Sequence, residues 1–528
     1  MIWKLRVACI LASAGVANAQ FGRGGAEWVT SGSDAQRSHS IPADPKISTD
    51  ALQKPPGFQF LWKMRLNNEA VQLNSLTPAI LMDRYIGYRG FRSLAFIAGS
   101  SNTIFAIDSD LNRIEWQARV PVSASSPGSL TCPGGMTSAI ARSTSATYPT
   151  PGAVGGGGRG GPARSDVGEP NEGAVTIAPA LAAQAGPNRG PGIRLPGLIY
   201  ALAGDGMLHT LYLSNGAESE QPTKFVPPNA NARGFIVIDN VGYAATENCN
   251  GAPSGVWAVD LTSKQVASWK PSNGGIAGSA GPAFGPDGTL YVTTTGGGLV
   301  GLEAKTLAVK DTYVSGGPEF TSSPVVFPYK DLNLVAAATK DGRIHLLDAA
   351  SVGSTLFKTP PYSATANFSP DALATWQSED GVRWLLAAVS GVPGPSSGFS
   401  ARNGPIANSA IAAWKLVERN GTVSLEPGWV SRDLISPLTP MIINGVVFAL
   451  SSGEYHTDDK SLTAAQRAQR SSPAVLYALD GATGKVLWES GKTITSFVHS
   501  GGLSGGASQL YLETYDQTLY AFGFPIEH

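Results

Sequence analysis

The stretch from Ala474 to Glu489 reads AVLYALDGATGKVLWE and has the pattern of a short β-hairpin. Val475 to Leu479 is an apolar run of strand length. The turn Asp480-Gly-Ala-Thr-Gly484 follows, in which the aspartate can accept hydrogen bonds from backbone amides and glycine can adopt a positive φ. Lys485 to Trp488 then returns as a second strand that ends in a large aromatic side chain. The stretch therefore predicts two paired strands joined by a tight turn.

Weaker copies of this hairpin recur along the chain. Repetition of a few short strands every 40 to 50 residues or so is typical of a β-propeller, in which stacked sheets bury faces that one sheet cannot bury alone. The Trp or Phe that ends each outer strand is expected to fill the wedge between neighbouring blades. The copies span residues 102–116, 255–269, 298–310 and 342–357, with more degraded ones at 200–213 and 411–425.

We predict an all-β protein folded as one propeller of eight four-stranded blades. The last blade, His499 to Phe522, has no outer strand after it, and Phe58 to Leu66 is expected to supply that strand, which leaves no sheet edge exposed. A seven-bladed ring remains an alternative, because residues 130–202 fit the repeat poorly. The eight inner strands are expected to begin near Leu76, Met136, Phe235, Gly281, Ser322, Asp371, Pro437 and His499.

Several insertions interrupt the repeat. Residues 149–196 are rich in glycine and proline and predict a long surface loop. Shorter insertions fall between the second and third strands of their blades, where loops emerge on the same face as the blade-to-blade connections. Binding residues concentrate on such loops, so we expect a ligand or partner at this face. The shorter insertions are Gly391–Ala407, Ser451–Ser472 and Asn248–Ser254.

The first residues have the features of a secretory signal peptide. Lys4 and Arg6 precede an apolar run that is too short to cross a bilayer, and Ala17-Asn-Ala19 supplies the small residues of a cleavage site. A periplasmic or secreted protein is therefore expected, with no transmembrane segment. The predicted divisions are a signal peptide at 1–19, an N-terminal extension at 20–57 and the propeller at 58–528.

The composition is poor in charge and rich in turn-forming residues. Charged residues make up 15% of the chain, with 63 glycines and 37 prolines, and only short helices are expected, at Asp50–Lys54 and Ser461–Gln469. Removing Lys4 and Arg6 from the 38 basic residues leaves 36 against 39 acidic ones. A slightly acidic chain does not attract polyanions, so nucleic-acid binding is disfavoured.

Two cysteines, Cys132 and Cys249, follow the predicted signal peptide. In an exported protein two cysteines can pair. A disulfide and two buried free thiols are equal alternatives at this point.

The repeat resembles that of the pyrroloquinoline quinone (PQQ) dehydrogenases and their non-catalytic relatives. The turn DGATGKVLW carries this resemblance. The segment from Trp28 to Arg37 supports it, because its W-x-x-x-G-x-D-x-x-R pattern is similar to the segment before the first blade in the alcohol dehydrogenase branch. The resemblance covers nearly all of the chain after the signal peptide, and it implies the propeller fold.

The same resemblance implies PQQ and a calcium ion at the channel mouth of an active enzyme. It also implies adjacent cysteines, which this sequence lacks, and a calcium-binding Asn where the chain reads Thr294-Thr-Gly-Gly297. At the position of the family's catalytic Asp, Glu319 is the nearest carboxylate, and Lys340 matches the basic residue that contacts the quinone. Glu319 is thus the catalytic candidate and Lys340 the cofactor-binding one. A solvated lysine in a hairpin turn is the plain alternative for Lys340.

Other chemical signals are sparse. Glu454, His456, Asp458 and Asp459 share one insertion and could meet a metal, but a solvated acidic loop is the favoured interpretation, and no metal site is predicted. No C-x-x-C-H motif occurs, so covalent haem is not indicated, and no nucleophile elbow that would position a serine is indicated either.

Three functions are consistent with this sequence. The favoured one is an exported binding or scaffold propeller without intact dehydrogenase chemistry, whose partner is a protein, a small molecule or a carbohydrate. The second is a divergent PQQ- and calcium-dependent oxidoreductase of alcohols or sugars. The third is a carbohydrate-binding propeller that uses Tyr and Trp on its loops.

Overall fold

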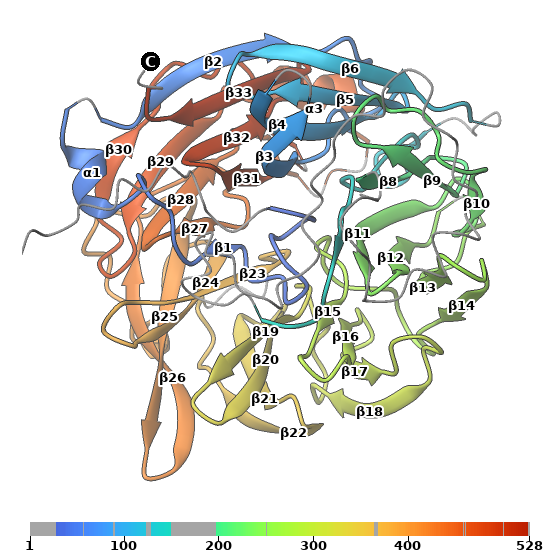
Figure 1. The fold of residues 1–528 in the computed structure, drawn as a ribbon. Coiled ribbons are helices and arrows are strands. Elements are labelled where there is room, and N and C mark those ends of the chain that lie inside the picture. Colours follow the sequence, from blue (N-terminus) through green and yellow to red (C-terminus); the bar gives the residue numbers. More distant parts are fainter. Residues whose placement is uncertain are drawn as a thin grey trace, which may run out of the picture.

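In a computed structural model, the protein forms a ring of eight β-sheets around a central axis (Figure 1). The structure describes residues 28–525 apart from residues 56, 88–89, 123–127, 149–196, 250, 364–367, 458, 460 and 500. The prediction of an all-β propeller is confirmed, and the ring has eight blades rather than seven. The predicted signal peptide and the loop predicted at 149–196 lie outside the described residues.

The first four blades are antiparallel sheets that run outward from the axis. Blade 2 has three strands, and Ala141 takes the inner position by bridging to Tyr200. Blade 3 gains a short parallel strand at its inner edge. The strands are β3 (Ile80–Gly87), β4 (Gly90–Gly99), β5 (Thr103–Asp108) and β6 (Arg113–Arg119) in blade 1; β8 (Leu198–Leu202), β9 (Met207–Tyr212) and β10 (Thr223–Lys224) in blade 2; β7 (Ser143–Thr144), β11 (Asn231–Ile238), β12 (Val241–Glu247), β13 (Gly255–Asp260) and β14 (Val266–Trp269) in blade 3; and β15 (Ala283–Phe284), β16 (Leu290–Thr293), β17 (Gly298–Leu302) and β18 (Val309–Val314) in blade 4.

The remaining four blades complete the ring. A short parallel strand of the N-terminal segment joins the inner edge of blade 7. The strands are β19 (Val325–Tyr329), β20 (Leu332–Thr339), β21 (Arg343–Asp348) and β22 (Ser351–Lys358) in blade 5; β23 (Leu373–Gln377), β24 (Arg383–Ser390), β25 (Ser409–Arg419) and β26 (Thr422–Val430) in blade 6; β1 (Ser40–Ile41), β27 (Met441–Ile443), β28 (Val446–Ser451), β29 (Val475–Asp480) and β30 (Val486–Glu489) in blade 7; and β31 (Leu503–Gly506), β32 (Gln509–Glu513), β33 (Thr518–Gly523) and β2 (Gln59–Arg65) in blade 8.

Helices are short, as the sequence predicts. Helix α1 (Thr49–Gln53) and helix α3 (Ala464–Arg470) lie close to the predicted positions, and a 3-10 turn forms at Pro395–Ser397. Helix α3 begins with a capping box, in which Thr463 and Gln466 satisfy each other's backbone amides. Within the described residues, no helix has the length and apolar character needed to cross a membrane.

The hairpin that identified the repeat forms as predicted. The carboxylate of Asp480 accepts hydrogen bonds from the Ala482 and Thr483 amides and from the Thr483 hydroxyl. Gly484 has a φ of +71° and lies against the indole ring of Trp429 from the preceding blade. Any side chain at this position would meet that ring. The turn therefore closes the hairpin of blade 7 and provides the surface on which Trp429 of blade 6 packs.

Tryptophans of the outer strands connect neighbouring blades. In three of them the indole N–H donates to a backbone carbonyl in the next blade, so the ring fills the wedge and its N–H has a partner. The expectation that these aromatic residues fill the spaces between blades is confirmed here. The pairs are Trp62 with Ser109 at 3.1 Å, Trp116 with Leu213 at 2.9 Å and Trp429 with Gly481 at 2.9 Å.

Ring closure follows the predicted route. Strand β2 pairs antiparallel with β33, with Phe60 opposite Phe522 and Arg65 opposite Thr518. The N-terminal strand thus becomes the outer strand of the blade that otherwise ends the chain (Figure 1). No edge is left between the first and last blades, which removes a site for pairing with other chains.

Residues 28–44, which we call the channel segment, lie inside the ring. The sequence placed them in an extension outside the propeller, but their backbone and side chains bond the inner region of every blade, in chain order. These contacts satisfy backbone groups at the inner edges of the blades that would otherwise lack a partner. The partners, from blade 1 to blade 8, are Leu81, Arg142, Phe235, Phe284, Val326, Thr375, Ile442 and Ser508.

Strand direction divides the connections between two ends of the ring. Because each blade is an antiparallel meander, its first and third connections lie at one end, which we call the turn end. The second connections and the blade-to-blade connections lie at the other, which we call the insertion end. The three shorter insertions predicted from the sequence follow β12, β24 and β28 and therefore lie at the insertion end.

Candidate functional site

Glu319 and Lys340, the two residues selected by family resemblance, lie together at the insertion end. Glu319 is in the connection from blade 4 to blade 5, and Lys340 follows β20. Their side chains form an ion pair, with Lys340 Nζ 2.6 Å from Glu319 Oε1, and both are substantially exposed. The Lys340 amide also donates to the Glu319 carbonyl at 3.0 Å. Each candidate thus neutralises the other, in an arrangement typical of a solvated surface pair.

The position expected to carry a calcium-binding Asn has no room for a side chain. A Cβ on Gly296 would lie 2.5 Å from the Asn273 carbonyl oxygen. Gly297 has a φ of +83°, and a Cβ there would lie 2.8 Å from Ser315 Oγ and 3.2 Å from the Pro318 carbonyl oxygen. The backbone of blade 4 is therefore packed where the family places a calcium ligand.

These observations test the fit of PQQ and calcium to this chain. Calcium requires about six to eight oxygen ligands, and the described residues hold no group of three or more His, Cys, Asp or Glu side chains that could bind a metal. Asn is replaced by packed glycine, and the only carboxylate at the catalytic position is bound by Lys340. The residues at the insertion end do not fit the quinone and its metal.

Glu454 serves as an anchor within its insertion. Its carboxylate is almost fully buried and lies 2.9 Å from His499 Nδ1, 3.3 Å from His456 Nε2 and 3.4 Å from Arg467 Nη2. Although burial raises the pKa of Glu454, hydrogen bonds from the two histidines lower it more, to about 2. The group ties the Ser451–Ser472 insertion to blade 8. Asp459 turns instead to Ser461, and Asp458 lies outside the described residues.

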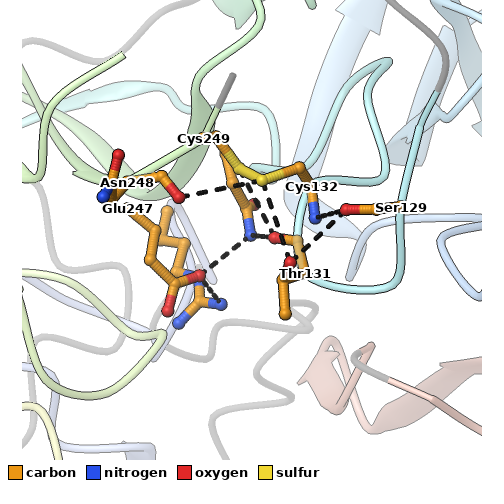
Figure 2. Close-up of a disulfide and its surroundings, with 8 residues drawn as sticks. Ser129, Thr131, Cys132, Glu247, Asn248 and Cys249 are labelled. Carbon is orange, nitrogen blue, oxygen red and sulfur yellow. Dashed lines mark hydrogen bonds and ion pairs between the residues drawn. A yellow bond between two sulfur atoms is a disulfide. The ribbon is translucent and has the colours of Figure 1, made fainter. Parts of the chain in front are cut away.

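Cys132 and Cys249 form a disulfide at the insertion end (Figure 2). Cys132 lies just before the inner region of blade 2, and Cys249 lies in the loop after β12 of blade 3. The Cys249 and Ala252 backbones bond each other across that loop, and Asn231 donates to the Thr131 carbonyl. The bridge therefore fastens two neighbouring blades, and the surrounding contacts are structural.

A cavity of about 850 Å³ lies at the turn end, opposite the face at which the sequence predicts binding. Its floor is the channel segment, and its walls are the ends of β19 and β23, the turn after β23 and two turns of blade 7. This volume is within the usual range for small-molecule sites. Neither Glu319 nor Lys340 contributes to its lining.

Arg383 is the only basic residue among the described residues that line this cavity. It is half-buried, its guanidinium lies over the Phe327 ring at 6.0 Å, and its Nη2 donates to Gln377 Oε1 at 3.2 Å. Its Nε has no hydrogen-bond partner in the described residues, and no carboxylate there pairs with it. Burial lowers the pKa of Arg383 to about 10. Within the described residues, the cavity wall thus holds a cation that no carboxylate pairs with.

The rest of the lining is rich in hydrogen-bond acceptors. Gln36 is 1% exposed, and its Nε2 donates to the carbonyls of Ala146 and Phe284 outside the cavity, while its Oε1 has no hydrogen-bond partner among the described residues. Asp34 accepts from the Gln36 and Ser38 amides, and burial raises the pKa of this carboxyl. The other carboxylates in the lining are Glu379, Asp380 and Asp480.

Sequence reasoning missed this cavity because its floor was assigned to an extension. The one signal available was local: the polar run Gln377 to Gly381 between two apolar strands, directly before Arg383. Trp376 also belongs to the lining, and its ring packs against Gly445 and Gly481 of blade 7. Nothing in the spacing of these residues indicated that they would meet the channel segment.

Comparisons with known proteins agree with the fold. No family model matches the chain, and no curated protein matches it by sequence. Among solved structures, the quinohemoprotein alcohol dehydrogenase from Comamonas testosteroni is similar with a TM-score of 0.55 at 12% identity, over 95% of this chain and 81% of that one. A quinohemoprotein alcohol dehydrogenase from Pseudomonas putida HK5 gives 0.54 at 11%, over 95% and 82%. A europium-containing methanol dehydrogenase gives 0.53 at 10%, over 95% and 98%. At these identities, the likeness shows the β-propeller fold alone.

Proposed function

We propose that this protein is an exported propeller that acts as a binding module and carries out no PQQ-dependent dehydrogenation. One observation carries the proposal: blade 4 packs glycine against backbone and Ser315 where the family pattern has a calcium ligand. The ion pair of Glu319 with Lys340 supports it, because each side chain is engaged by the other. Export is proposed from the signal-like N-terminus.

Calorimetry with PQQ and calcium chloride tests this proposal. We expect no calcium-dependent binding heat, and no dye reduction with methanol, ethanol or glucose as substrate. The fold alone would allow dehydrogenase activity, since one fold hosts many functions. Whether this protein has that activity therefore depends on the residues of the site.

Two substitutions make the test specific. A tight calcium-dependent PQQ complex that is weakened by Lys340→Gln, with dye turnover abolished by Glu319→Gln, would overturn the proposal. Lys330→Gln is the matched control, because Lys330 is an exposed lysine of the same blade and pairs with Glu418 at 2.5 Å. A loss caused equally by Lys330→Gln would indicate only a general charge effect and would leave the proposal standing.

A further inference from the structure

The cavity at the turn end has an uneven distribution of charge. Arg383 supplies a positive charge at one corner, beside Phe327, Gln377 and the start of β24. Tyr148 lines the same cavity, and its hydroxyl donates to Asn333 Oδ1 at 2.8 Å, so its oxygen can accept from a ligand but its proton is committed. An anionic group fits this corner, since a guanidinium presents several N–H donors in one plane to a carboxylate.

The remaining lining favours donors on the ligand. Four carboxylates are acceptors, as is Gln36 Oε1, which has no partner in the part of the chain that the structure describes, and a carboxylate can only accept hydrogen bonds. Hydroxyl groups on a ligand would supply the missing donors, whereas a second negative charge would be repelled by the same carboxylates. A doubly charged phosphate monoester is disfavoured for this reason, as is a cofactor with several carboxylates.

We propose that this cavity binds a small hydroxylated monocarboxylate, of the size of a sugar acid with one or two rings, with its carboxylate on Arg383. The inference deepens the proposed binding function by naming the site and ligand class, and rests on that function. Trp376 adds an aromatic surface to the wall, and the apolar part of a sugar ring can pack on such a surface. The site lies on the opposite end of the ring from Glu319 and Lys340.

Calorimetry with paired probes tests the ligand class. Lactobionate and galacturonate carry one carboxylate each, and lactose and galactose are their neutral counterparts of similar size. We expect at least one acid to bind and its neutral counterpart to bind at least tenfold more weakly. If neither acid binds, or if the neutral sugars bind equally well, the proposal is wrong. Binding of spermidine in place of the acids would also overturn it, by showing that the carboxylates select the ligand.

Arg383→Gln tests the position of the site. We expect this variant to bind the acid at least tenfold more weakly, because it loses the charge-assisted hydrogen bonds. Arg419→Gln should leave binding unchanged, since Arg419 is an exposed arginine of the same blade that pairs with Glu426. If Arg383→Gln does not fold, phenylglyoxal modification of the wild-type protein gives the answer. The bound acid should protect Arg383 in peptide mapping, and equal modification with and without the acid would contradict the proposal.

The two proposals can fail separately. A calcium-dependent PQQ complex that is sensitive to Lys340→Gln and insensitive to Arg383→Gln would remove the proposed function and leave the cavity to be tested alone. Absence of acid binding, together with absence of PQQ binding, would remove the present inference only.

Discussion

Gly484 shows how one position can serve two blades at once. It requires a left-handed backbone conformation for the turn after Asp480, and it also leaves space for the Trp429 ring. A Cβ at this position would lie 2.7 Å from Trp429 Cδ2, which no packed side chain tolerates. Gly421 has a similar φ of +75° but has open space around its Cα. A substitution at Gly421 therefore tests the cost of the positive φ alone, whereas one at Gly484 tests that cost together with the clash against Trp429.

Gly484→Ala should destabilise the protein more than Gly421→Ala does. We expect Gly421→Ala to lower the free energy of unfolding by about 1 kcal/mol, from the positive φ alone. Gly484→Ala should add about 1–3 kcal/mol, because the Trp429 wedge must move. Urea unfolding of both variants measures the difference. Equal losses would show that the indole ring gives way without strain.

Glu513 makes stability depend on pH. It is fully buried between blades 8 and 1, accepts a hydrogen bond from the Ala79 amide at 3.1 Å, and burial raises its pKa to about 8. Between the ordinary glutamate value of 4.5 and pH 8, the folded state holds a proton that the unfolded state has lost. The stabilisation is therefore complete at low pH, and it is lost as the pH rises towards 8.

Glu513→Gln should remove this dependence. In the wild-type protein we expect the free energy of unfolding to fall by about 1 kcal/mol from pH 7 to pH 8. Buried His39 and His345, whose pKa values are lowered to about 4 by burial, act in the opposite direction but mainly below pH 6.5. Urea unfolding at both pH values checks the slope. The exposed Glu69→Gln should retain it, and a slope that survives in Glu513→Gln would refute the assignment.

At the scale of elements, the Cys132–Cys249 disulfide joins a blade that has few strands to one that has many. Blade 2 has three strands and depends on Ala141 for its inner position, while blade 3 has five. A bridge between them restricts the unfolded chain over a separation of 117 residues. Such a restriction stabilises the folded state, because it removes conformations available to the unfolded one.

Replacing both cysteines by serine should lower stability without changing the fold. We expect a loss of about 2–4 kcal/mol for protein made under oxidising conditions. Circular dichroism should be unchanged, and the urea midpoint should match that of the wild-type protein treated with reductant. Non-reducing peptide mapping should recover the crosslinked peptides. Recovery of two alkylatable thiols from native oxidised protein would contradict the bridge.

At the scale of the whole molecule, the fold could be predicted from the repeat, whereas the location of the cavity could not be predicted from the sequence. The hairpin at 474–489, its copies and the unpaired last blade were sufficient to predict eight blades and closure by Phe58–Leu66, because periodic apolar patterns report directly on local pairing. The cavity could not be predicted in this way. Its lining comes mainly from the channel segment and three blades, with Ser48, Thr49 and Tyr148 added from outside them, and the path of the chain through the ring brings Gln36 and Arg383 to the same cavity.

The path of the channel segment has a consequence for how the protein comes into being. Residues 28–44 leave the ribosome long before their partner Ser508 and the β33 partner of β2 are made. The channel segment therefore cannot form all its contacts until nearly the whole chain has been made. Long sequence separation of this kind slows folding. The complete ring is thus expected only after the strands of blade 8 have been made, so the growing chain has no closed ring until this blade emerges.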